Sequence, residues 1–134
     1  MRITVNPDTE ASSGFGYAEA GQYRLRVVKV EQVKGKKAPY LKWEYEFVDP
    51  NVQAVGSTPE KPIRVGHVFE NTTLSTEKKN SQFALRNMIE ALGLAWADFD
   101  TESAYGLELD AILKIEEYEG NFSNKIARVL PPKK

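Results

Sequence analysis

Two basic turns with neighbouring aromatic residues hold the side chains best suited to binding chemistry. A lysine ammonium neutralises a phosphate and an aromatic ring stacks on a nucleobase, so a groove that carries both suits a single-stranded nucleic acid. One group lies between residues 34 and 42 and the other between residues 118 and 125. The sequence predicts these contact residues: Lys34, Lys36, Lys37, Tyr40, Lys42, Tyr118, Phe122, Asn124 and Lys125.

Catalytic and metal-binding chemistry has much weaker support. The chain has one histidine, His67, and no cysteine, so neither a nucleophilic triad nor a thiolate metal site can be assembled. Glu108 and Asp110 share one face of a predicted strand, which resembles acid–base spacing, but alternating acids are common on solvated strands. The sequence contains no glycine-rich phosphate loop and no calcium-loop pattern. We therefore expect no enzymatic activity, no cofactor and no metal.

Length and composition fit a single domain. The 134 residues are 41% hydrophobic and 28% charged, which is ordinary for a globular chain with one core. No apolar run approaches the roughly 18 residues of a membrane span. The start of the chain, with Asp8 and Glu10, lacks the apolar segment of a signal peptide. The expected location is the cytoplasm, with no membrane partner, and the oligomeric state is left open.

Charges are unevenly distributed along the chain, although its net charge is only −1. Residues 22–42 carry seven basic side chains and one acidic one, a local balance of +6. Residues 98–119 carry eight acids and one lysine, a local balance of −7. Such segregation predicts a positive face and a negative face, unless the fold interleaves the two segments and removes the contrast.

Alternating apolar residues predict five β-strands. In the first strand the apolar parity changes between Val27 and Val28, which indicates a β-bulge. In the second strand Trp43 belongs to the inward face, and in the fifth strand Phe122 begins an inward parity that continues to Leu130. The predicted strands are Gln22–Val33, Tyr40–Val48, Gly66–Leu74, Leu107–Glu116 and Phe122–Leu130.

One amphipathic helix is predicted between the third and fourth strands. Asn80 can cap its start through the side-chain oxygen, and Gly93 suits the left-handed residue that ends a helix. Residues 94–99 are then expected to form a short helical turn whose two aromatic rings close one end of the core. The apolar face of the helix follows the i, i+3, i+4, i+7 spacing and consists of Leu85, Met88, Ile89 and Leu92.

This order of elements predicts a mainly β fold, a five-stranded Greek-key barrel of the OB type with one helix between the third and fourth strands. In that architecture the ligand surface comprises strands two and three and the turns 1–2 and 4–5, where the basic and aromatic residues lie. The main alternative is a β-sandwich with one added helix. Residues 1–16 are expected to form an arm that is ordered only by docking, and residues 17–134 a single OB-type domain.

Several motifs resemble phage-encoded single-stranded-DNA-binding proteins of the OB-fold type. The resemblance covers most of the region from Gly21 to Pro131. The motifs that carry it are Tyr40–Phe47, Phe69–Ser75, Leu85–Gly93 and Glu117–Gly120. The resemblance implies a non-enzymatic, largely sequence-independent single-stranded-DNA-binding protein in phage DNA replication or recombination. It also implies the host bacterial cytoplasm as the location and phage or host replication and recombination proteins as partners.

One departure and one alternative accompany this interpretation. Many replication proteins of this class end in an acidic tail, whereas this chain ends in Pro131-Pro132-Lys133-Lys134, so recruitment through such a tail is not expected. The alternative function is a phage structural or protein–protein interaction module, in which the same small barrel binds protein through the acidic segment 98–119. DNA binding at low salt distinguishes the two.

Overall fold

The computed structural model describes residues 15–97 and 99–132, and the predicted strands and helix are present within these ranges. Within these ranges the chain forms seven strands, one α-helix and one short 3-10 helix. They are β1 (Phe15–Gly16), β2 (Gly21–Val33), β3 (Tyr40–Phe47), β4 (Arg64–Val65), β5 (Val68–Thr73), α1 (Phe83–Ala91), the 3-10 helix Thr101–Ala104, β6 (Glu108–Tyr118) and β7 (Asn121–Leu130).

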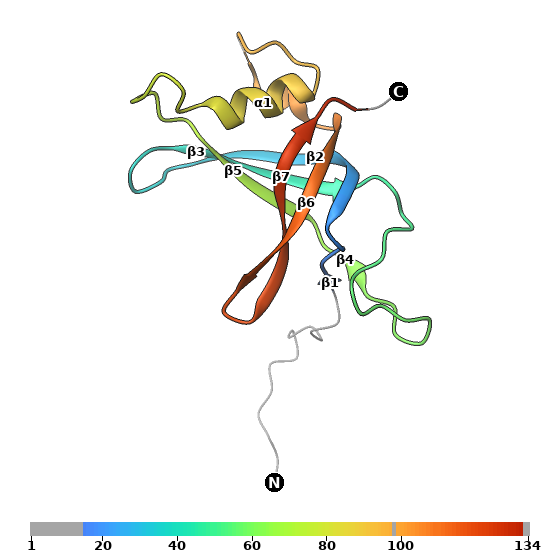
Figure 1. Cartoon of the computed structure of the whole chain (residues 1–134). Helices are drawn as coiled ribbons and strands as arrows, with labels where there is room; N and C mark the ends of the chain where they lie inside the picture. Colours follow the sequence, from blue (N-terminus) through green and yellow to red (C-terminus); the bar gives the residue numbers. More distant parts are fainter. Residues whose placement is uncertain (1–14, 98, 133–134) are drawn as a thin grey trace, which may run out of the picture.

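The five longer strands form one antiparallel sheet in the order β5-β3-β2-β6-β7. The helix α1 lies across one end of these strands, and the short parallel pair β1 and β4 lies near the opposite end (Figure 1). The predicted mainly β fold with five principal strands and one helix between the third and fourth of them is therefore confirmed. The pair of β1 and β4 was not predicted, because two-residue strands leave no periodic signal.

A β-bulge in β2 changes the face of the strand at the predicted place. The pairing between β2 and β3 shifts register between Val27 and Lys29, so Val28 is the additional residue. Before the shift Leu25 and Val27 point into the core, and after it Val30 does. The bulge keeps apolar residues inward on both halves of a 13-residue strand and increases its bend.

The inward face of β3 forms the centre of the core, as predicted. Trp43 and Tyr45 have no exposed surface, and their rings lie nearly parallel with centroids 6.1 Å apart. The indole Nε1 of Trp43 donates a hydrogen bond of 2.8 Å to the hydroxyl oxygen of Thr72. The Tyr45 hydroxyl donates to the sulfur of Met88, and burial raises the pKa of that hydroxyl well above its usual value. The two polar groups are thus partnered within the core.

The helix begins later than predicted. Gln82, not Asn80, occupies the N-cap position, and no side chain caps the helix start. Asn80 instead accepts a hydrogen bond from the backbone of Phe83 through its main-chain carbonyl, because residues 77–82 form a bend and turn before the helix. At the other end Gly93 has a φ of 83°, which confirms the predicted left-handed residue. The apolar face of α1 buries Leu85, Met88, Ile89 and Ala91 against the sheet.

Residues 94–99 do not form the predicted helical turn in the part that the structure describes, which excludes residue 98. The 3-10 helix lies further along, at Thr101–Ala104, and the Asp100 side chain caps it by accepting from the backbone of Glu102. The predicted packing role of the two aromatics is nevertheless present. Phe99 stacks beside Trp43 with ring centroids 6.2 Å apart, and Trp96 is partly buried against the core.

The hairpin of β6 and β7 turns through two residues with positive φ, Glu119 at 50° and Gly120 at 81°, which is the pattern of a type I′ turn. Further along, the pairing shifts register because Ala127 is an additional residue in β7. Val129 therefore takes the inward position opposite Ala111. The predicted inward parity from Phe122 to Leu130 is right at Ile126 and wrong at both ends, because Phe122 is 47% exposed and Leu130 does not pack against the core cluster.

The start of the described chain docks on the body of the fold. Asn124 holds the backbone of Ala18 from both sides, because its side-chain oxygen accepts from the Ala18 N–H at 2.8 Å and its side-chain nitrogen donates to the Ala18 carbonyl at 2.9 Å. The ring of Tyr17 stacks on that of Phe122. Most of the predicted arm, residues 1–14, lies outside the described residues. Within the described ranges, no helix has the length and apolar character needed to cross a lipid bilayer.

Candidate functional site

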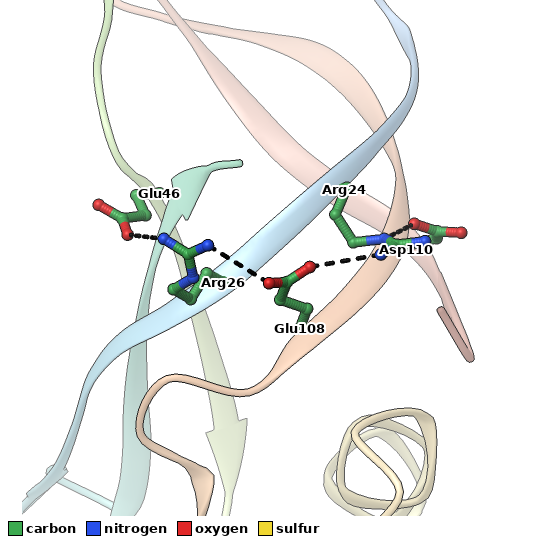
Figure 2. A network of polar contacts seen from close by, with 5 residues as sticks. All are labelled: Arg24, Arg26, Glu46, Glu108 and Asp110. Carbon is green, nitrogen blue, oxygen red and sulfur yellow. Dashed lines mark hydrogen bonds and ion pairs between the residues drawn. The ribbon is translucent and has the colours of Figure 1, made fainter. Parts of the chain in front are cut away.

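A ladder of ion pairs crosses the outer face of the sheet where β3, β2 and β6 lie side by side (Figure 2). Arg24 contacts Asp110 at 2.6 Å and Glu108 at 3.3 Å. Arg26 contacts the other oxygen of Glu108 at 3.3 Å and Glu46 at 3.0 Å. The carboxylates raise the pKa of both guanidinium groups, chiefly through the hydrogen bonds to Asp110 and Glu46 respectively. The register of β2 against β6 produces the ladder, since it places Arg24 opposite Asp110 and Arg26 opposite Glu108.

This ladder alters the charge distribution that the sequence predicts. The basic segment 22–42 and the acidic segment 98–119 pair with each other through β2 and β6, so part of the contrast between them is removed. Glu108 and Asp110, which have the spacing of an acid–base pair, are held by arginines. The two arginines are likewise engaged, and the positive groups that remain open to a ligand are mainly lysines.

The predicted lysine turn lies between β2 and β3. Lys34, Lys36 and Lys37 are exposed, and within the described ranges none of them has a carboxylate at ion-pair distance. Gly35 is required here, because a Cβ at this position would collide with the carbonyl oxygen of Ala38. The half-buried ring of Tyr40 covers Gly35, which assigns this predicted contact residue a packing role in the turn.

A cleft of about 460 Å³ lies between the outer strands β5 and β7 and is called the outer-strand cleft here. Phe69 projects into solvent with 47% of its surface exposed, and the Lys42 ammonium lies 5.2 Å from the centre of its ring. Lys125 faces the same cleft from β7 and pairs with Glu116 at 3.5 Å. The cleft thus brings together predicted residues from both basic groups. Its lining is Lys42, His67, Phe69, Glu70, Asn71, Glu116, Ser123, Asn124 and Lys125.

Phe69 was not among the predicted contact residues. The pattern that identifies it is the alternation of β5, in which Val68 and Thr72 are buried while the intervening Phe69 is exposed. A large aromatic ring at an outward position of a strand, beside the Lys42 ammonium, makes Phe69 a candidate contact residue.

The other predicted contact residues occupy different surroundings. The side-chain amide of Asn124 is engaged by Ala18, and the exposed Phe122 stacks on Tyr17 at a centroid distance of 5.5 Å. Tyr118 ends β6, and its side chain lies outside the described part of the structure. The structure therefore collects Lys42, Asn124 and Lys125 in one cleft and leaves the lysine turn and the Phe122 ring outside it.

His67 lies between β4 and β5 and belongs to neither strand. The predicted strand Gly66–Leu74 included His67, and it is wrong at this residue. The Nδ1 of His67 is 2.6 Å from a carboxylate oxygen of Glu44, and its side chain is 44% exposed. Within residues 15–97 and 99–132, no group of three histidine or carboxylate side chains is arranged to hold a metal ion.

Glu70 faces the core side of β5, opposite Trp43 in the register, and lines a second cleft. This inner cleft has a volume of about 530 Å³ and lies between β5, α1 and β7. Burial raises the pKa of the Glu70 carboxyl, and the backbone N–H of Asn71 and the charge of Lys125 partly oppose that rise. A raised folded-state pKa means that ionisation of Glu70 weakens the fold.

We expect Glu70→Gln to increase thermal stability at neutral pH but not at pH 4. The carboxyl's favourable contribution is complete below its unfolded pKa, near 4.5, and is lost as the pH rises through the higher folded value. The melting temperature of the variant minus that of the wild type should therefore increase from pH 4 to pH 8, by a few degrees. The matched control is Glu117→Gln, because Glu117 is exposed on β6. A constant difference across this range would show that burial does not disfavour the Glu70 carboxylate.

The fold and the cleft define a class of protein: a small, mainly β domain with an open cleft between its outer strands, lined by lysines and an exposed phenylalanine. The chain matches over residues 5–123 the family model described as "Protein of unknown function (DUF669)", and it belongs to that family. No curated protein matches the chain.

Proposed function

We propose that this protein is a single-stranded-DNA-binding protein built on an OB-type Greek-key barrel. The sheet order β5-β3-β2-β6-β7, with α1 between β5 and β6 in the chain, is the order expected for that architecture. The bulge in β2 and the contact between the outer strands β5 and β7 support strong curvature of the sheet.

The outer-strand cleft is the observation that carries the proposal. Phe69 offers an aromatic face to a base, while Lys42 and Lys125 lie on either side of the cleft as point charges for phosphates. The cleft lies on β3 and β5, the second and third strands of the proposed barrel, where OB folds hold oligonucleotides. The lysine turn at residues 34–37 adds three further positive charges next to β3.

The contacts support binding with little sequence preference. Lysine contacts to phosphates and aromatic stacking do not distinguish one base from another. Asn124 contributes indirectly under this proposal, because its amide holds the backbone of Ala18 and thereby braces β7 beside Lys125. In keeping with the resemblance to phage proteins, we propose that this activity serves phage DNA replication or recombination in the host cytoplasm, with replication and recombination proteins as partners.

Fluorescence anisotropy tests the proposal directly. A labelled oligonucleotide of about 15 thymidines, within the range that OB folds contact, is titrated with protein at low and at high salt. We expect tight binding at low salt that weakens as salt rises, and much weaker binding of a duplex of the same length. No binding at low salt would favour the alternative of a phage structural or protein–protein interaction module.

The lysine turn provides a quantitative prediction. Replacing Lys34, Lys36 and Lys37 together with glutamine should weaken binding and flatten its dependence on the logarithm of salt concentration. The slope should fall by about 0.7 for each phosphate that the variant no longer neutralises, the value for single strands. The measurement is the anisotropy titration repeated at several salt concentrations, and Lys61→Gln, an exposed lysine in the loop before β4, is the control. An unchanged slope would assign the phosphate contacts to Lys42 and Lys125 instead.

A further inference from the structure

A third cleft lies beside α1, between the helix, the turn that precedes it and the segment that follows it. This helix cleft has a volume of about 540 Å³. Phe83 at the start of α1 is 66% exposed, the largest value among the exposed large apolar side chains in the described ranges. Across the cleft, the Arg86 guanidinium lies 6.0 Å from the centre of the Trp96 ring, and Trp96 is only partly buried.

Two lysines add positive charge at the mouth of this cleft. Lys78 and Lys79 are exposed, and within the described ranges neither has a carboxylate at ion-pair distance. The turn that carries them is held in shape, because the Lys78 N–H donates to the Ser81 hydroxyl and the Gln82 side chain donates to the Leu74 carbonyl. The helix cleft therefore presents two aromatic rings and three cations, of which only Arg86 is paired, with Glu90 at 3.1 Å.

The three clefts share lining residues and therefore adjoin one another in series, which defines a path across the surface. The outer-strand cleft and the inner cleft share Glu70 and Lys125. The inner cleft and the helix cleft share Asn87 and Glu90 on α1. The path thus runs from Phe69, along β7, over α1 to Phe83 and Trp96. Rings at both ends and lysines beside them are the features that a flexible strand of nucleotides requires.

We propose that the helix cleft is a second contact site for single-stranded nucleic acid, which extends the site in the outer-strand cleft. This inference rests on the proposed function. Phe83 and Trp96 stack on bases, and Lys78 and Lys79 neutralise phosphates. A short oligonucleotide fills the outer-strand cleft alone, whereas a longer one also passes over α1.

Oligonucleotide length separates this inference from the proposed function. The triple variant Lys78→Gln, Lys79→Gln and Phe83→Ala is titrated with oligothymidines of about 5 and about 20 nucleotides, lengths chosen to fill one cleft or all three. We expect its affinity for the longer oligonucleotide to fall by about tenfold, while affinity for the shorter one is unchanged. The control is Val55→Ala with Lys61→Gln, one exposed apolar residue and one exposed lysine in the loop before β4, at the end of the molecule opposite α1 (Figure 1).

Tryptophan fluorescence gives an independent readout. The chain has two tryptophans, and Trp43 has no exposed surface, so a change on binding reports Trp96. The longer oligonucleotide should quench the fluorescence, the shorter one should not, and Trp96→Phe should remove the effect. The second site would be overturned if the triple variant lost affinity equally for both lengths. It would also be overturned if that variant lost no affinity for the longer oligonucleotide and this oligonucleotide did not quench the wild type. Either result would leave the proposed DNA binding intact. If neither length binds the wild type, the proposed function fails and the second site fails with it.

Discussion

Replacing Trp43 with alanine is expected to lower the free energy of unfolding by about 3–5 kcal/mol, as removal of a large buried aromatic side chain does. The indole has no exposed surface and is stacked with the rings of Tyr45 and Phe99, so the variant leaves a cavity within the core. It also leaves the Thr72 hydroxyl without its partner in a buried position. Because a domain of this size is stable by only about 5–15 kcal/mol, the loss is a large share of the total.

Urea denaturation followed by circular dichroism measures this loss as a shift of the midpoint at constant slope. Two further variants separate packing from hydrogen bonding. Thr72→Val keeps the ring and removes the acceptor of the indole N–H, and it should cost about 1–3 kcal/mol. Trp43→Phe keeps part of the ring volume and should fall between Thr72→Val and Trp43→Ala. A Trp43→Ala protein with an unchanged midpoint would contradict the inward orientation of the β3 face.

The strands could be predicted because burial on one face leaves a period of two in the sequence. In β3 the alternation of Trp43 and Tyr45 with Lys42 and Glu44 corresponds to the buried and outward faces that the structure has. In β2 even the bulge could be placed, since an additional residue shifts the apolar parity at Val28. A local sequence pattern therefore suffices to predict a strand or a bulge when the cause of that feature lies in neighbouring residues.

The second bulge shows where this inference fails. Ala127 is additional in β7, yet the sequence around it contains apolar residues at both parities, so no shift is visible. The predicted helix start was wrong for a related reason. Asn80 is a good capping residue, but the turn that begins at residue 77 uses its carbonyl and continues to Gln82 before the helix begins. Intrinsic propensity indicates which position a residue favours, whereas the hydrogen bonds of the neighbouring residues determine the position that it occupies.

The charge ladder could not be derived from the sequence, because it depends on the register of strands far apart in the chain. Arg24 and Asp110 are 86 positions apart and meet only because β2 pairs with β6. The same holds for Asn124 and Ala18, 106 positions apart, whose hydrogen bonds engage a side chain predicted to contact a ligand. Composition and spacing identify which residue types are present, whereas the sheet order determines which of them face each other and which remain open.

Replacing Phe69 with alanine is expected to weaken single-stranded DNA binding roughly 5- to 150-fold, the equivalent of about 1–3 kcal/mol for one stacked base. The fold should be unaffected, since Phe69 is 47% exposed and lies outside the buried core cluster. Stacking releases no counterions, so the salt dependence of binding should keep the wild-type slope. Lys42→Gln should instead change the salt dependence. Its loss of affinity should be smaller at high salt, and affinity should depend less steeply on salt concentration than in the wild type.

Anisotropy titrations of Phe69→Ala, Lys42→Gln and the double variant at several salt concentrations complete a double-mutant cycle. The Lys42 ammonium lies 5.2 Å from the Phe69 ring centre, so the two effects should not add, with a coupling energy of at least about 0.5 kcal/mol. Ile115→Ala is the matched control, because Ile115 is exposed to a similar degree on β6 and lines none of the three clefts. If Phe69→Ala binds as tightly as Ile115→Ala, the outer-strand cleft does not stack a base, and the oligonucleotide site would have to be sought at the hairpin turn beside Phe122.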